Sequence, residues 1–313
     1  GEGASGNPAA LVTPRLDAGN PAVSTLFADA FAYATEFYRR LCPDAIVSTG
    51  VDHAGLQPRD AARFAKILAQ DVFARSDLTP FQAGEAPDLP DLSGLRLNAA
   101  LCVRPTLITQ ALLAGQPVTA QTVTGWRRDG ENLTLRTEAG EYAGYDAVVL
   151  ACGAGLFDLG QGDDLRPVRG QVEYAQEHAP QRAASWGGYV APLEGGFVFG
   201  ATHDRDDRDA DARDEDRQRN LETLAKAMPE RAAHINPDAL TSRAAIRVAS
   251  RDHLPRAHEV EAGVWRLTAL GGRGFCLAPL LAAELIAALR SASSPLQRIA
   301  KTLLPDRDTK SPS

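Results

Sequence analysis

The sequence has little cysteine, and its cysteines are scattered. Four occur in 313 residues, and none forms a Cys-x-x-Cys pair. Zinc sites usually draw on such pairs, so we predict no metal site. Isolated thiols are typical of a reducing compartment, which favours a cytoplasmic location with reduced, mostly buried cysteines. The four residues are Cys42, Cys102, Cys152 and Cys276.

Signals for membranes and nucleic acids are also missing. No apolar run stands out as long enough to span a bilayer, and no charged-then-apolar leader opens the chain, so we predict neither membrane attachment nor secretion. The net charge is −7, from 33 basic and 40 acidic residues. This lowers the expectation of an RNA partner but does not exclude one, because local basic patches decide such binding.

A third absence concerns nucleotide binding. Dinucleotide-binding folds open with a strand, a Gly-x-Gly-x-x-Gly turn, a helix and an acidic residue for the ribose. We find no such unit in these 313 residues. The first residue is Gly1 rather than Met, and residues 1–8 resemble the middle of a longer sequence, so we expect a truncated amino end.

Hydrophobic periodicity predicts a mixed α/β protein. Apolar residues recur at three- and four-residue steps over residues 22–41, which indicates a helix that Pro43 ends. The continuous apolar run at residues 147–151, within a strand expected over residues 146–151, predicts a strand buried on both faces. Further helices are expected at residues 60–73, 106–113, 214–227 and 278–289, and further strands at residues 95–103, 118–126, 132–137, 168–176, 196–202, 243–249 and 264–270.

Turn and charge signals predict the connections. Asp129-Gly130 indicates a tight hairpin turn. Residues 76–94 contain three prolines and two glycines and are expected to form a loop. The dense run of mixed charge at residues 203–219 is expected to lie in solvent.

Two glycine clusters follow apolar strands, ACGAG at residues 151–155 and ALGGRG at residues 269–274. Glycine lets the backbone approach a phosphate or a ring closely, and a helix start presents N–H groups and a positive dipole end. Each cluster alone is more often an ordinary turn. Two of them in one α/β chain favour a nucleotide-type cofactor.

The order of several motifs adds a family resemblance. ASGNP at residues 4–8 and PRLD at residues 14–17 precede the aromatic helix, and behind it follow VRGQ (168–171), GYVAP (188–192), FGAT (199–202), IRVASRDHLP (246–255) and GRGFCLAP (272–279). In this order the chain resembles the D-amino-acid oxidase and glycine oxidase superfamily. The likeness is greatest to the C-terminal oxidase modules of bifunctional tRNA 5-methylaminomethyl-2-thiouridine biosynthesis proteins.

The resemblance implies an α/β fold with two lobes. Residues 1–44, 106–165 and 246–313 would form a discontinuous, Rossmann-like FAD-binding lobe of the glutathione-reductase type, lacking its N-terminal glycine-rich unit. Residues 45–105 and 166–245 would form a substrate lobe with a large, mostly antiparallel sheet. The motifs do not define an oligomeric state.

The resemblance also implies FAD as cofactor and an oxidoreductase acting on a CH–NH group. The implied reaction removes the carboxymethyl group from 5-carboxymethylaminomethyl-(2-thio)uridine, a wobble uridine of tRNA. Because the cofactor supplies the chemistry, the protein mainly orients the substrate. Two alternatives stay open: an oxidase of free glycine, sarcosine or D-amino acids, and a truncated, non-catalytic remnant.

Arginine suits a substrate carboxylate best, because its planar fork binds both oxygens. Arg247 lies on an apolar predicted strand, where an unpaired charge is costly, and the resemblance places the carboxylate-binding arginine there. Arg273 in the glycine turn is the second candidate, and Tyr189 resembles an aromatic residue near the substrate. Structural ion pairs or solvent-facing arginines, and a core tyrosine, are the alternatives. His253 is expected to be structural.

For FAD, the resemblance implies contacts made largely by backbone groups. The first turn would contact the flavin side of the cofactor, and one strand would contact the adenine. The first glycine cluster would contact the pyrophosphate or ribose, and the second the ribityl chain and ring. The implied residues are Ser5, Gly6, Asn7, Val123, Ala151, Cys152, Gly153, Gly272, Gly274, Phe275 and Cys276. Cys152 and Cys276 are expected to pack rather than to act as nucleophiles.

Overall fold

The computed structural model describes residues 3–290. Its largest sheet has ten strands, and eight of them form a continuous path. In spatial order these are β1 (Ala10–Val12), β4 (Gly94–Val103), β2 (Ile46–Ala54), β10 (Ala183–Ser185), β11 (Tyr189–Leu193), β12 (Gly196–Gly200), β9 (Leu165–Ala175) and β13 (Asp204–Arg205). Two strands pair off this path, β14 (Thr241–Ser250) with β9 and β3 (Leu78–Phe81) with β4. Within this sheet, as far as the structure describes it, only β10 and β2 pair in parallel, which confirms the predicted large, mostly antiparallel sheet.

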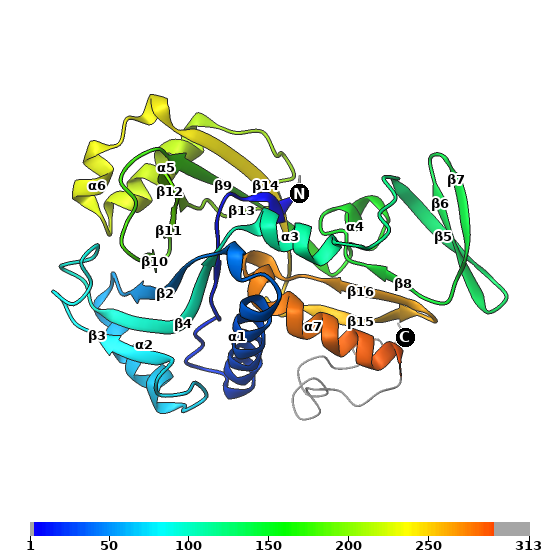
Figure 1. The fold of residues 1–313 in the computed structure, drawn as a ribbon, viewed down its shortest axis with the longest axis horizontal. Helices are drawn as coiled ribbons and strands as arrows, with labels where there is room; N and C mark the ends of the chain where they lie inside the picture. Colours follow the sequence, from blue (N-terminus) through cyan, green and yellow to red (C-terminus); the bar gives the residue numbers. More distant parts are fainter. Residues whose placement is uncertain (1–2, 291–313) are drawn as a thin grey trace, which may run out of the picture.

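Two smaller sheets complete the β structure (Figure 1). One has the order β15-β16-β8, with β15 (Arg256–Glu261), β16 (Val264–Thr268) and β8 (Val148–Leu150). The other is a meander of β5 (Val123–Asp129), β6 (Asn132–Thr137) and β7 (Gly140–Tyr145), which projects at the right of Figure 1. The predicted Asp129-Gly130 hairpin is confirmed, since β5 and β6 pair antiparallel around Gly130 at φ 64°.

The helices lie on and between the sheets. The α-helices are α1 (Pro21–Leu41), α2 (Pro58–Ala69), α3 (Pro105–Leu113), α4 (Gly155–Asp158), α5 (Asp214–Ala225), α6 (Pro229–His234) and α7 (Gly274–Leu289). Short 3-10 helices are η1 (Ala4–Gly6), η2 (Pro43–Ala45), η3 (Pro237–Ala239) and η4 (Gly271–Arg273). In Figure 1, α1 and α7 lie side by side, and α5 and α6 lie at the upper left.

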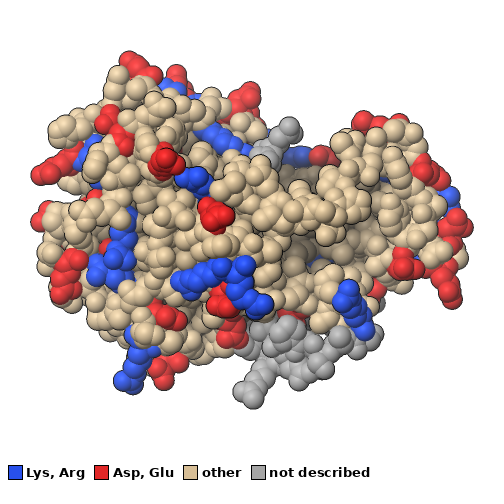
Figure 2. All heavy atoms as spheres, in the orientation of Figure 1, with Lys and Arg blue, Asp and Glu red and all other residues tan. Residues whose placement is uncertain are grey.

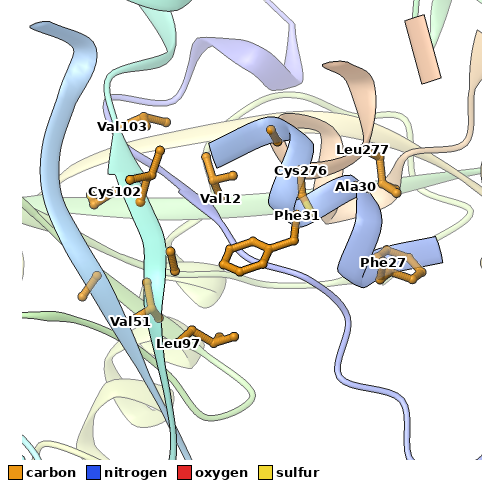
Figure 3. Packing of buried hydrophobic residues seen from close by; sticks show 14 of the residues in the cluster. Val12, Phe27, Ala30, Phe31, Val51, Leu97, Cys102, Val103, Cys276 and Leu277 are labelled. Atoms are coloured by element: carbon orange, nitrogen blue, oxygen red, sulfur yellow. The ribbon is translucent and has the colours of Figure 1, made fainter. Parts of the chain in front are cut away.

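The main core forms between α1, α7 and the large sheet. Helix α1 begins where the Asn20 side chain accepts N–H groups of the first turn, with proline at the next position. Its apolar face directs the Phe31 ring toward β4, which carries Leu97, and Phe27 lies farther along the helix in the same core (Figure 3). This core takes side chains from both predicted lobes. The lobe boundaries stay a prediction, and their terminal residues 1–2 and 291–313 lie outside the described part.

The structure corrects several predictions about burial. Val149 is 40% exposed, because β8 is an edge strand with one face uncovered rather than a strand buried on both faces. Within the charged run, Asp216 is only 2% exposed, since it pairs with the buried guanidinium of Arg169 on β9. Cys152 is exposed, whereas the other three cysteines are buried as expected. The packing role predicted for Cys152 therefore fails.

Local predictions were incomplete where long-range pairing decides the structure. The expected loop at residues 76–94 contains β3, and the strands β1, β2, β7, β10, β11, β13 and β15 were not predicted. The helix expected at residues 60–73 ends at Ala69, and the closing helix begins at Gly274 instead of residue 278. Each of the missed strands pairs with a neighbour in one of the three sheets, and this pairing selects its extended form.

One described segment corrects the expectation about membranes. Residues Gly271–Leu289 are long and apolar enough to cross a bilayer by length and composition alone. In this structure α7 packs against α1, and Cys276, Leu277 and Leu281 enter the main core. A core helix of this kind meets the same criterion, so the finding adds no argument for a membrane.

Candidate functional site

A cavity of about 490 Å³ lies where the first turn, the large sheet and the second glycine cluster meet. The chain reaches it from η1 and β1, from β9 and β14 of the sheet, and from η4 at the start of α7. Of the predicted site residues, it is lined by Ser5, Asn7, Tyr189, Gly272, Gly274, Phe275, Arg247 and Arg273. Segments more than two hundred residues apart in sequence thus form one site.

Arg247 enters this cavity from β14. Its Nη2 donates to the Thr202 carbonyl at 2.8 Å, and no carboxylate among the described residues lies within 4.0 Å of its guanidinium. Burial lowers its pKa, so the charge is partly desolvated, although an arginine stays protonated. Neither predicted alternative for Arg247, a structural ion pair or a solvent-facing side chain, describes this environment.

Gly170 on β9 makes the room for Arg247. An ideal Cβ at Gly170 would lie 1.5 Å from Arg247 Nη2, so a larger residue there would displace this guanidinium. On the other side, an ideal Cβ at Gly272 would lie 3.5 Å from Arg247 Nη1. The Arg247 guanidinium therefore lies between Gly170 on β9 and Gly272 in the glycine turn, as the predicted site requires.

Arg273 and Tyr189 line the same cavity with different polar neighbours. Arg273 donates through Nη1 to the hydroxyl of Thr13, and burial lowers its pKa. Burial raises the pKa of Tyr189 to about 12, although the nearby Arg247 opposes the rise. Tyr189 is thus a neutral phenol at ordinary pH, partly exposed to the cavity rather than enclosed in the core.

Two histidines and a serine at the cavity were not predicted. His53 Nδ1 lies 2.9 Å from Ser185 Oγ, and burial lowers the His53 pKa to about 4, helped by Arg273 and Arg63. His203 also lines the cavity, and burial lowers its pKa, helped first by Arg247. His53 and Ser185 lie on β2 and β10, two strands missing from the sequence prediction.

The glycine turn and the start of α7 form an open cradle. Gly271 has φ 54°, a conformation that favours glycine, and an ideal Cβ at Gly274 would meet nothing within 4 Å. No side chain caps the first turn of the 16-residue helix α7. Its first N–H groups and positive dipole end are therefore available to a negatively polarised group held in the cavity.

Other predicted cofactor residues lie outside this cavity. Cys276 is fully buried in the main core, which raises its pKa to about 12 and agrees with a packing role. Gly6 is adjacent to lining residues but does not line the cavity, and Val123 lies at the start of the projecting meander.

The pairing of β8 with β16 determines where the first glycine cluster lies. Strands β8 and β16 run parallel, with Leu150 opposite Arg266, so their carboxyl ends meet at the same edge of the small sheet. Residues 151–153 and the second glycine cluster both follow that edge. Ala151, Cys152 and Gly153 are exposed there. The structure therefore brings the two clusters to one edge, but it does not bring residues 151–153 into the Arg247 cavity.

Among residues 3–290, no group of three or more histidine, cysteine or acidic side chains could hold a metal ion. The donors that face the cavity are cationic or neutral. They suit an anionic organic group and a flat cofactor better than a metal cation.

The sequence matches the DAO family, described as FAD dependent oxidoreductase, over residues 1–289. The chain belongs to this family, whose cofactor is FAD and whose amine-oxidising members act on C–N bonds. The open glycine cradle and the uncapped start of α7 fit such a cofactor. Arg247, which has no carboxylate partner in the described part of the chain, fits an acidic substrate.

Curated relatives extend the comparison. The tRNA 5-methylaminomethyl-2-thiouridine biosynthesis bifunctional protein MnmC of Caulobacter vibrioides is 43% identical over 304 residues, covering 96% of this chain and 51% of that protein. The protein of the same name from Idiomarina loihiensis is 30% identical over 318 residues, covering 94% and 51%. This chain thus spans about half the length of these relatives.

Solved structures show the same fold at low sequence identity. Glycine oxidase from Geobacillus kaustophilus aligns with a TM-score of 0.74 at 20% identity, covering 94% of this chain and 86% of that one. Iminodiacetate oxidase from Chelativorans sp. aligns with a TM-score of 0.78 at 18% identity, covering 95% and 88%. The predicted fold class is confirmed.

Proposed function

We propose that this chain is the oxidase part of an enzyme that removes the carboxymethyl group from 5-carboxymethylaminomethyl-(2-thio)uridine in tRNA. The products are glyoxylate and the 5-aminomethyl nucleoside. The relatives that match nearly the whole chain are named for biosynthesis of 5-methylaminomethyl-2-thiouridine in tRNA, which supports this substrate over a free amino acid. A cytoplasmic location, where tRNA is abundant, follows from the proposal.

The observation that supports the proposed reaction most directly is the environment of Arg247. Among the described residues this partly buried guanidinium has no carboxylate partner, and it lines a cavity with a glycine turn, so binding an anion there would be strongly favoured. A glycine-like amine brings its own carboxylate. Binding it would offset the desolvation of Arg247 and would fix the adjacent CH₂–N unit beside the turn.

Other residues of the cavity would bind the cofactor and position the substrate amine. Gly272, Gly274 and Phe275 would hold the ring and ribityl chain of FAD through backbone groups, and the cofactor would supply the acceptor for a hydride from the substrate carbon. Tyr189 presents a neutral phenol that can donate to the substrate without adding charge. Loss of hydride and of the amine proton leaves a C=N bond, and water then splits it into glyoxylate and the primary amine.

Residues 151–153 would contact the pyrophosphate or ribose at the shared sheet edge, and Val123 the adenine. We further propose that the segments 1–44, 106–165 and 246–313 serve the cofactor, while 45–105 and 166–245 serve the substrate.

The direct test supplies the purified, FAD-loaded chain with tRNA or nucleoside carrying the carboxymethylaminomethyl group. Mass spectrometry should detect the 5-aminomethyl nucleoside, and a carbonyl assay should detect an equal amount of glyoxylate. Turnover of glycine, sarcosine or D-amino acids with no turnover of either uridine substrate would overturn the proposal in favour of an amino-acid oxidase. A colourless protein that stays apo in excess FAD would overturn it in favour of a non-catalytic remnant.

A further inference from the structure

A second cavity of about 310 Å³ borders the Arg247 cavity. The two share four lining residues: Thr13, His53, Ser185 and Arg273. We call it the arginine cavity, because Arg15, Arg63 and Arg273 all line it. Because the walls are shared, a ligand in the arginine cavity and a ligand beside Arg247 can be parts of one molecule.

The arginine cavity has an excess of positive charge. Its single carboxylate, Asp17, pairs with Arg15 at 2.7 Å and also accepts backbone N–H groups from Gly19 and Asn20. Arg63 donates to the Leu16 carbonyl at 2.9 Å and has no carboxylate within 4.0 Å among the described residues.

The third arginine, Arg273, contacts Thr13 and likewise has no carboxylate within 4.0 Å in the described part of the chain. The field of Arg273 and Arg63 also contributes to the depressed pKa of the His53 imidazole. In the described part of the chain, two of the three guanidinium groups therefore have no carboxylate within 4.0 Å.

The chemistry of the cavity points to a phosphate. Guanidinium groups bind phosphate oxygens in pairs, and several of them around one polar cavity suit a tetrahedral dianion or a phosphodiester. The net charge of the chain is −7, and acidic and basic side chains are interspersed on the face that Figure 2 shows. A polyanionic substrate therefore needs a local cationic site of this kind.

We propose that the arginine cavity binds a backbone phosphate of the polynucleotide whose modified uridine reacts beside Arg247. This inference rests on the proposed function, because a free amino acid has one carboxylate for Arg247 and no group for a second anion site. In this arrangement Arg15 and Arg63 act as specificity-determining residues. They hold the nucleotide outside the reacting centre, whereas Arg247 holds the carboxymethyl group.

The first experiment compares Arg15→Gln, Arg63→Gln and Arg63→Lys with the wild type. Arg59→Gln is the matched control, because it removes an exposed charge from the same helix α2. Each is assayed with tRNA and with the phosphate-free nucleoside carrying the same group. Each Gln variant should lose about tenfold in kcat/KM for tRNA, the effect of one lost charge-assisted hydrogen bond. Each Gln variant should keep the wild-type kcat/KM for the nucleoside. The kcat/KM of Arg63→Lys for tRNA should lie between those of the wild type and of Arg63→Gln.

A binding readout makes the inference independent of turnover. The affinity for the tRNA anticodon stem-loop is measured against salt concentration, and each lost phosphate contact should reduce the slope of log affinity against log salt by about one. Inorganic phosphate is the second probe. It should raise the thermal midpoint of the wild type and of Arg59→Gln, and raise it less in Arg15→Gln and Arg63→Gln.

The outcomes separate the two proposals. Equal losses on tRNA and nucleoside, or Gln variants that match Arg59→Gln in every readout, would overturn the phosphate site while leaving the oxidase reaction intact. A wild type that binds phosphate through Arg15 and Arg63 but oxidises neither uridine substrate would overturn the proposed reaction and leave the anion site standing.

Discussion

Replacing Arg247 by methionine tests the proposed carboxylate site directly. Methionine keeps a long, flexible side chain of similar reach but removes the charge and the fork. Nη2 donates to the Thr202 carbonyl and Nη1 faces Gly272, so a bound carboxylate can gain at least one to two charge-assisted hydrogen bonds. At about 1.5–3 kcal/mol each, their loss costs about 3 kcal/mol of binding.

That free energy corresponds to a loss on the order of 100-fold in kcat/KM. The assay is the anaerobic bleaching of the flavin by the carboxymethylaminomethyl nucleoside, compared with the neutral carbamoylmethyl analogue. Arg247→Met should lose the preference for the acid, because nothing remains to distinguish the carboxylate from the amide. Arg247→Lys should lose less, since it keeps the charge but not the planar fork.

The matched control is Arg205→Met. Arg205 is exposed on β13 and is paired with Val168 of β9, the residue that Arg247 faces from β14. It should keep wild-type kinetics. Thermal melts should show Arg247→Met to be no less stable than the wild type, because a partly desolvated charge is removed. If Arg247→Met stays folded, binds FAD and still prefers the acid over the amide, the assignment of Arg247 as carboxylate ligand is refuted.

Three further predictions concern the supports of this site. Gly170→Ala places a Cβ against Arg247 Nη2 and should reduce kcat/KM by about 100-fold through misplacement of the guanidinium, measured by the same flavin assay. Asp216→Asn leaves Arg169, which is 0% exposed, without its counter-charge, and should lower the free energy of unfolding by about 3–5 kcal/mol in denaturant melts. His53 has its pKa lowered to about 4 in the folded protein from 6.5, so the unfolded state binds protons more readily and stability falls as pH drops from 6.5 to 4. His53→Gln should remove up to about 3 kcal/mol of this acid sensitivity, seen as a flatter profile of thermal midpoint against pH.

Controls of the same chemistry lie elsewhere on the chain. Gly19→Ala adds a Cβ whose nearest atom would be 3.8 Å away, Asp214→Asn removes a carboxylate that is 87% exposed, and His234→Gln changes an exposed histidine. Effects as large in the controls as in Gly170→Ala, Asp216→Asn and His53→Gln would contradict the reasoning from burial and contact.

Much of the fold follows from local sequence. The 22–41 periodicity with Asn20 and Pro21 ahead of it, the Asp129-Gly130 turn, and the apolar strands that end in glycine clusters are short-range signals, and the structure confirms them. Their physical basis is local: capping, turn dihedrals and the burial of one periodic face depend on neighbours a few residues away. The ordered motifs also indicated the family and its cofactor.

Tertiary structure decided the rest. Strands such as β2 and β10 depend on partners far along the chain, and with them came His53 and Ser185, which no motif marked. Which surfaces pack together decides three further features. These are the counter-ion of Arg247, the exposure of Val149, and the meeting of Arg15, Arg63 and Arg273 in one cavity. Residue types limit the chemistry that a chain can do, but burial and distance determine which charges remain available to bind a substrate.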